Sequence, residues 1–208
     1  MGMWTRLFGG AKHKEANPVV KRIRRYVPNP TPDQSVAIER VPKLAATLHQ
    51  GADYIYRRVI QDTLQEFDAR FDSKIVPSID EEKRGQMTEC LLHYMIFQAY
   101  ADLSARIHDP NLAGFMLDAV HYELFGELPG EKESFIAYLK YENKNFEDPS
   151  AAPIYKFGFD LAAITGLPDM NLPLILSQQS PLIRELTGRL TQLALTDDPG
   201  GEHPGESS

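Results

Sequence analysis

Apolar side chains recur along most of this chain with the period of an α-helix. Leu48, Ile55 and Val59 begin one such pattern, which predicts a long helix over residues 42–72 with a bend at Gly51. The same kind of spacing predicts helices over 79–107, 110–126, 131–146, 151–165 and 181–195, and a short helix or turn over 172–177. Residues 90–97 are apolar almost all round, which is typical of a helix at the buried centre of a domain.

Residues with capping chemistry precede several of these segments. Thr31-Pro32-Asp33-Gln34 combines a capping box with proline at the first helical position, so a helix should begin at residue 32. Ser78-Ile79-Asp80-Glu81 has the capping-box pattern before residues 79–107, and Asp109-Pro110 precedes the next helix. No strand-like alternation exceeds four residues and no hairpin signal is present. The sequence therefore predicts an all-α, compact, single-domain bundle of about six to seven helices over residues 32–195, with flexible termini.

Composition agrees with one globular domain, but the charge is unevenly distributed. The 208 residues are 42% hydrophobic and 25% charged, with a net charge of −7. Residues 1–31 hold seven basic side chains and one acid, a net +6, whereas the remainder carries −13. We expect residues 1–31 to be a basic flexible arm, within which residues 18–26 form a short helix or strand. Residues 196–208 are acidic and lack large apolar side chains, which predicts a disordered tail.

Several common chemistries lack the residues they need. There is no Gly-x-Ser-x-Gly nucleophile elbow, no phosphate-binding Gly-x-x-x-x-Gly-Lys-Ser/Thr loop and no Gly-x-Gly-x-x-Gly turn after a strand. The one cysteine, Cys90, lies in an apolar run, which predicts that it is a small core residue. A single cysteine, no run of about 18 apolar residues and no secretory signal lead us to expect a cytoplasmic protein. We expect no cofactor, with a transition-metal ion as the alternative, and the basic arm allows a membrane-peripheral location.

One set of residues could bind a transition metal. Glu89 and His93 are four apart on one predicted helix, and Asp118 and His121 are three apart on the next, so each pair shares a helical face. If the two helices form an antiparallel hairpin, the pairs lie about one turn apart in height. The set is incomplete, because no Glu-x-x-His occurs and no second set matches it. The other interpretation is that both histidines are half-buried and hydrogen-bonded.

Clustered aromatic side chains allow a ligand-binding groove as a further hypothesis. Tyr54, Tyr94, Phe135 and Phe157 each belong to a group of aromatic residues on a successive predicted helix. Aromatic residues at helical spacing are more often core, with tyrosine hydroxyls reaching the surface.

The basic arm has three interpretations. An apolar tip with Trp4, Leu7 and Phe8, followed by basic residues, combines two signals for anionic membranes or for a partner. The basic side chains that would make this contact are Lys21, Arg22, Arg24 and Arg25. These cations could also contact nucleic acid, but the acidic body disfavours that. Alternatively, the arm is a solvated tail or packs on its own acidic body.

The absence of a complete catalytic set favours a non-catalytic interaction protein. We expect an adaptor, assembly factor or chaperone-like module that docks a protein partner through the bundle and contacts an anionic surface through the arm. The alternative is a metal-dependent helical enzyme or sensor using the carboxylate and histidine pairs. Leu182, Leu186, Leu190 and Leu193 share a face of the last predicted helix, which would serve a homodimer as well as a core.

Overall fold

Every regular element in the described part of the chain is helical. The computed structural model describes residues 17–130, 153–166 and 171–196. In these ranges the elements are α2 (Pro18–Tyr26), α3 (Pro32–Glu39), α4 (Val41–Ile55), the π-helical turn η1 (Tyr56–Ile60), α5 (Gln61–Phe71), α6 (Ile75–Ser78), α7 (Glu81–Ile107), α8 (Pro110–Phe125), α10 (Pro153–Thr165), α11 (Asn171–Ser177) and α12 (Ser180–Leu195). The all-α prediction is confirmed for these residues. Predicted helix 131–146 and residues 197–208 lie outside them.

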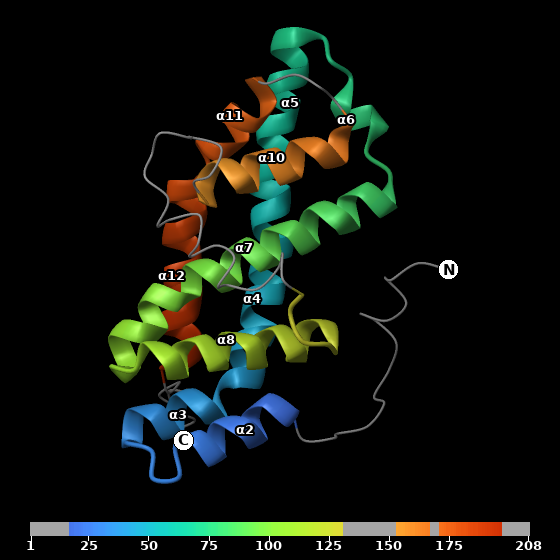
Figure 1. Cartoon of the computed structure of the whole chain (residues 1–208). Helices are drawn as coiled ribbons and strands as arrows, with labels where there is room; N and C mark the ends of the chain where they lie inside the picture. The colour runs from blue at the N-terminus through green and yellow to red at the C-terminus, as the bar shows by residue number, and fades with distance from the viewer. Residues whose placement is uncertain (1–16, 131–152, 167–170, 197–208) are drawn as a thin grey trace, which may run out of the picture.

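Helix α7 lies at the centre of the arrangement and contacts α4, α8, α10 and α12 (Figure 1). Its sequence explains this position, because apolar residues cover most of its circumference in the middle turns. Side chains such as Leu91, Met95 and Leu103 are fully buried. The prediction that this helix forms the buried centre is confirmed.

The predicted helix over 42–72 is confirmed as a continuous rod made of α4, η1 and α5 (Figure 1). Its irregularity lies in η1, where the Gln61 amide donates to the Tyr56 carbonyl five residues back. Gly51, the predicted bend, has a different role. A Cβ atom added there would lie 2.3 Å from Cδ1 of Leu190, so the glycine lets α12 approach α4 closely.

The start of α7 differs from the prediction by two residues. Asp80, not Ser78, is the N-cap, and its carboxylate accepts from the Lys83 amide at 2.8 Å. The Ser78 hydroxyl instead donates to the Ile75 carbonyl at 2.7 Å, because Ser78 ends the preceding turn α6. The capping box at Thr31 and the N-cap at Asp109 are both confirmed.

Helices α10 and α12 pack against α7, and α11 packs against α10. Phe157 of α10 stacks on Tyr94 of α7 with ring centroids 4.4 Å apart, and the Tyr94 hydroxyl hydrogen-bonds Ser180 at the start of α12. Tyr94 and Phe157 are both buried, so these two aromatic residues are core. Tyr54, by contrast, is 59% exposed on α4.

The buried face of α12 is not the leucine face predicted from the sequence. Leu186 and Leu190 are partly buried, but Leu182 and Leu193 are 43% and 61% exposed. Helix α12 faces α4 and α7 mainly with Ile183, Thr187, Thr191 and Ala194, which share the adjacent side of the helix.

Part of the predicted basic arm is folded: the short helix or strand expected over residues 18–26 is a helix, and it packs on the helical body. Residues 18–26, assigned to the flexible arm, form helix α2 and pack against α8, with Val19 and Ile23 buried. Predicted contact residues Trp4, Leu7 and Phe8 lie outside the described residues. Within the described ranges no helix is both long and apolar enough to cross a membrane.

We predict that Gly158→Ala destabilises the fold by about 2 kcal/mol, because overpacking against an immovable neighbour outweighs the gain in helix propensity. A Cβ atom at Gly158 would lie 2.2 Å from the backbone oxygen of Pro173 in α11. Gly51→Ala is the matched control, since its nearest neighbour is the tip of a flexible leucine. Urea unfolding midpoints measure both changes, and equal losses for the two variants would contradict this account.

Candidate functional site

The candidate site is the basic face of α2, which we define as Lys21, Arg22, Arg24 and Arg25. Helix α2 begins at this place because Asn17 is followed by Pro18 at the first helical position. The Asn17 Oδ1 atom accepts from the amides of Val19 and Val20 at 3.0 and 3.4 Å. Arg24 and Arg25 lie in the last turn, where positive charge is favourable for the helix dipole.

The same asparagine fastens α2 to α8. The Asn17 Nδ2 atom donates to the Ala119 carbonyl at 3.0 Å and to Oε1 of Glu123 at 2.7 Å. At the other end of α2, the rings of Tyr26 and Phe115 are arranged edge to face, with their centroids 5.3 Å apart. Contacts from 17 to 119 and from 26 to 115 show that the two helices run antiparallel.

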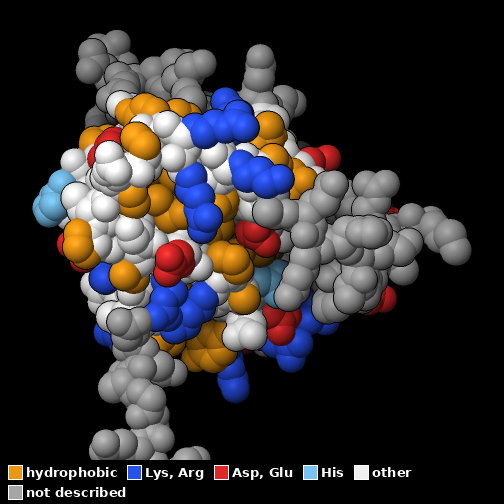
Figure 2. Space-filling model, turned by 90° about the horizontal axis from the view of Figure 1, so that it is seen from below, with side chains coloured by type: hydrophobic (Ala, Val, Ile, Leu, Met, Phe, Trp, Pro, Cys, Tyr) orange, Lys and Arg blue, Asp and Glu red, His pale blue; other side chains and the backbone are white. Residues whose placement is uncertain are grey.

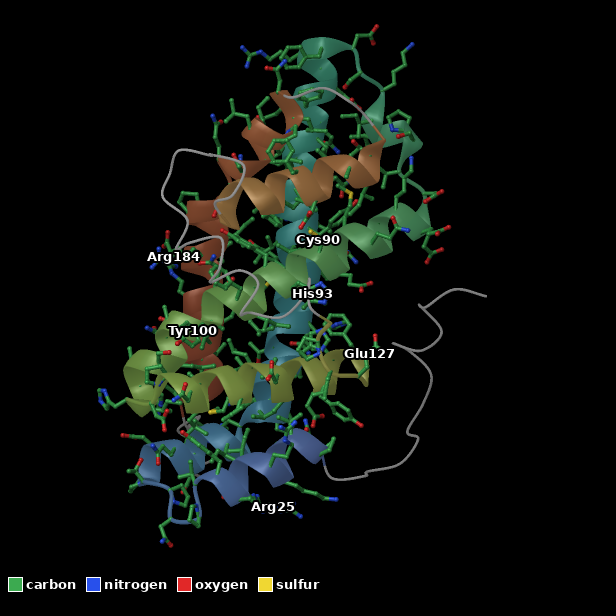
Figure 3. All side chains as sticks on the ribbon, in the orientation of Figure 1. Arg25, Cys90, His93, Tyr100, Glu127 and Arg184 are labelled. Carbon is green, nitrogen blue, oxygen red and sulfur yellow. The ribbon has the colours of Figure 1, made fainter. Side chains whose placement is uncertain are left out.

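This docking leaves the four cations on the outside. Val19 and Ile23 turn into the core, and Lys21, Arg22, Arg24 and Arg25 are all exposed. Figure 3 shows the Arg25 side chain projecting away from the lower end of the molecule. Residues 17–32 contain no acid, so the face carries four positive charges held by a packed helix. Such a surface attracts anions with little loss of backbone entropy on binding.

One carboxylate lies beneath this face. Burial raises the pKa of Asp118 in α8, and the positive charge of Arg22 lowers it in part. The charges of Asp118 and Arg22 therefore attract each other across the contact between α8 and α2. Lys21, Arg24 and Arg25 are exposed and form the outer part of the basic face.

The predicted metal-binding residues are brought together only in part. The rings of His93 and His121 stack with centroids 5.3 Å apart, and Phe125 lies 4.8 Å from His93. The antiparallel approach predicted for the two helices therefore places the two histidines in contact. Figure 3 shows His93 and Glu127 on the side where α8 ends.

The geometry of this pair differs from that of a metal centre. Nδ1 of His121 lies 3.0 Å from the Glu127 carbonyl, which orients the ring. The pKa of Asp118 is affected by the charge of Arg22 on α2, and Glu89 lies one turn from His93 on α7. Among residues 17–130, 153–166 and 171–196, no three His, Cys, Asp or Glu side chains are grouped so that they could hold a metal. Cys90 is half-buried on α7.

Three residues that hold α2 against α8 were not predicted from the sequence: Asn17, Tyr26 and Phe115. Asn17 followed by proline is a helix-start signal, and Val19 and Ile23 are four apart, as expected for one buried face. Nothing local indicates that this face packs on α8.

The comparisons with known proteins add no assignment: no family model, curated protein or solved structure matches this chain.

We predict that Asn17→Ala destabilises α2 by about 2 kcal/mol, because the variant loses a helix cap and two hydrogen bonds to α8. Amide hydrogen exchange of residues 18–26, together with urea unfolding, measures the effect. Thr31→Ala, which removes an exposed cap on α3, is the matched control and should cost about 1 kcal/mol. Unchanged protection of α2 in Asn17→Ala would show that apolar packing alone holds the helix.

We also predict that Arg22→Gln raises the pKa of Asp118, because the variant removes the charge that lowers it and leaves the burial that raises it. With its pKa raised on folding, the Asp118 carboxyl favours the folded state at low pH, and this contribution is lost as pH rises through the folded pKa. Carboxyl NMR titration measures the change. Arg24→Gln, on the far side of α2, should leave the pKa of Asp118 nearly unchanged.

Proposed function

We propose that this protein is a non-catalytic interaction module that docks a protein partner with its helical body and contacts an anionic surface with the basic face of α2. The observation that carries the proposal is the burial of Val19 and Ile23 against α8, which holds four exposed cations on a rigid support. A disordered arm with the same charge would lose conformational entropy on binding, whereas a docked helix has lost most of it already.

The body has features suited to a protein contact. Leu182 and Leu193 project from the outer side of α12, and Leu174 of α11 is 47% exposed. These leucines offer apolar side chains that a protein partner could cover. They lie on elements other than α2, so the two proposed contacts can be made at the same time. The proposal places the protein in the cytoplasm, at the periphery of the surface it contacts.

A charge-reversal variant tests the anionic contact. We expect Lys21→Glu/Arg24→Glu/Arg25→Glu to lose at least about 100-fold in affinity for phosphatidylserine vesicles and for polyglutamate, since each cation near an anionic surface contributes about 1 kcal/mol. Sedimentation with vesicles and equilibrium dialysis with polyglutamate, at physiological salt, measure the two affinities.

The matched control reverses three exposed cations outside α2, with the same change in net charge: Arg58 in η1, Arg70 in α5 and Lys74 between α5 and α6. This control should bind nearly as the unaltered protein does. If both triple variants lose affinity equally, net charge rather than the basic face of α2 is responsible, and the proposal fails.

A further inference from the structure

Two exposed aromatic rings lie at the edge of the basic face. Tyr26 of α2 is 51% exposed and Phe115 of α8 is 38% exposed, and their rings meet edge to face at an interplanar angle of 72°. An aromatic pair contributed by two helices makes a continuous apolar patch. Single exposed apolar side chains are ordinary on protein surfaces, but a paired patch beside a concentrated charge is less so.

Helical geometry places this patch directly beside the cations. Arg22 and Tyr26 are four residues apart and share the row of α2 that borders α8. Lys21 and Arg25 form the adjacent row, also four residues apart. Along the seam on α8, Phe115 lies beside Tyr26. The cations therefore border the aromatic pair.

The surface lies on the outermost layer of the molecule. Figure 1 shows α2 and α3 beneath α8 at the lower end, with α2 lying across that end. Figure 2, seen from below, shows Lys and Arg side chains between patches of apolar side chains on this face. A helix lying across an end can bring its whole outer side onto a flat partner.

We propose that the anionic surface of the preceding section is a phospholipid membrane, and that Tyr26 and Phe115 enter its interfacial region while the basic face of α2 contacts lipid headgroups. This inference rests on the proposed function and names its partner. Cations alone recognise any polyanion, whereas rings beside them gain additional free energy only where an apolar phase lies next to the charge. Tyrosine suits this depth, because its hydroxyl stays in water while its ring is buried.

The proposed membrane contact is shallow, because the apolar side of α2 is not available to insert. Amphipathic helices at membranes usually insert their own apolar side, but the apolar side of α2 is buried against α8. The rings at the seam therefore supply the apolar part of the contact, and α2 stays folded on the body. Binding should accordingly combine a salt-sensitive part from the cations and a salt-resistant part from the rings.

The test compares two ligands with the full chain at physiological salt: vesicles of phosphatidylcholine with phosphatidylserine, and soluble polyglutamate. We expect Tyr26→Ser/Phe115→Gln to lose about tenfold in vesicle partitioning, which corresponds to about 1.4 kcal/mol, and less than twofold in polyglutamate binding. The single variants should each lose a part of this. The matched control Tyr54→Ser/Phe71→Gln removes exposed rings of the same types from α4 and α5 and should change neither.

Thermal unfolding of each variant verifies that it is folded, and the single variants serve if the double variant is not. Vesicle partitioning of the double variant equal to that of the unaltered protein overturns the inference, as does an equal loss towards both ligands, which would indicate an acidic macromolecule. Neither outcome contradicts the proposed function, which is tested separately by the charge-reversal variants of the preceding section.

Discussion

The burial of α7 is the constraint on which the rest of the structure depends. Its middle turns are apolar on nearly every side. The hydrophobic effect therefore stabilises this helix fully only when other helices cover its whole circumference. Helices α4, α8, α10 and α12 cover it. Glycines allow close contacts between the helices of this surrounding layer and their neighbours. Gly51 admits Leu190 of α12, and at Gly158 the backbone of α11 approaches α10.

The position of the basic face of α2 depends on α7 indirectly, through α8. Helix α8 uses one side against α7 and leaves another side to be covered. Helix α2 covers it with Val19 and Ile23, and Asn17 fixes the end of the contact by capping its own helix and bonding to α8. Because the apolar side of α2 packs against α8, the charged side of α2 is directed towards solvent.

The two histidines lie in contact but do not form a metal site with the nearby carboxylates of the described residues. The chain brings His93 and His121 into a stacked pair, as the approach of α7 and α8 requires. Nδ1 of His121 lies within hydrogen-bond distance of the Glu127 carbonyl, and the charge of Asp118 on the same helix interacts with that of Arg22 on α2. Residues three apart on a helix share a side, but that side is wide enough to face two different neighbours. The carboxylate and the imidazole of this pair therefore serve different interfaces.

Local chemistry determined most of the secondary structure from the sequence. Helical periodicity, Thr31 and Asp109 as caps, and the apolar run in α7 depend only on neighbours in the chain, so they could be read without coordinates. Tertiary packing decided the rest. Whether residues 18–26 are an arm or a docked helix depends on α8, about a hundred residues away, and the exposure of Leu193 depends on how α12 is rotated against α4 and α7. The seam between Tyr26 and Phe115 likewise joins residues that no local pattern relates, because it exists only where two distant helices meet.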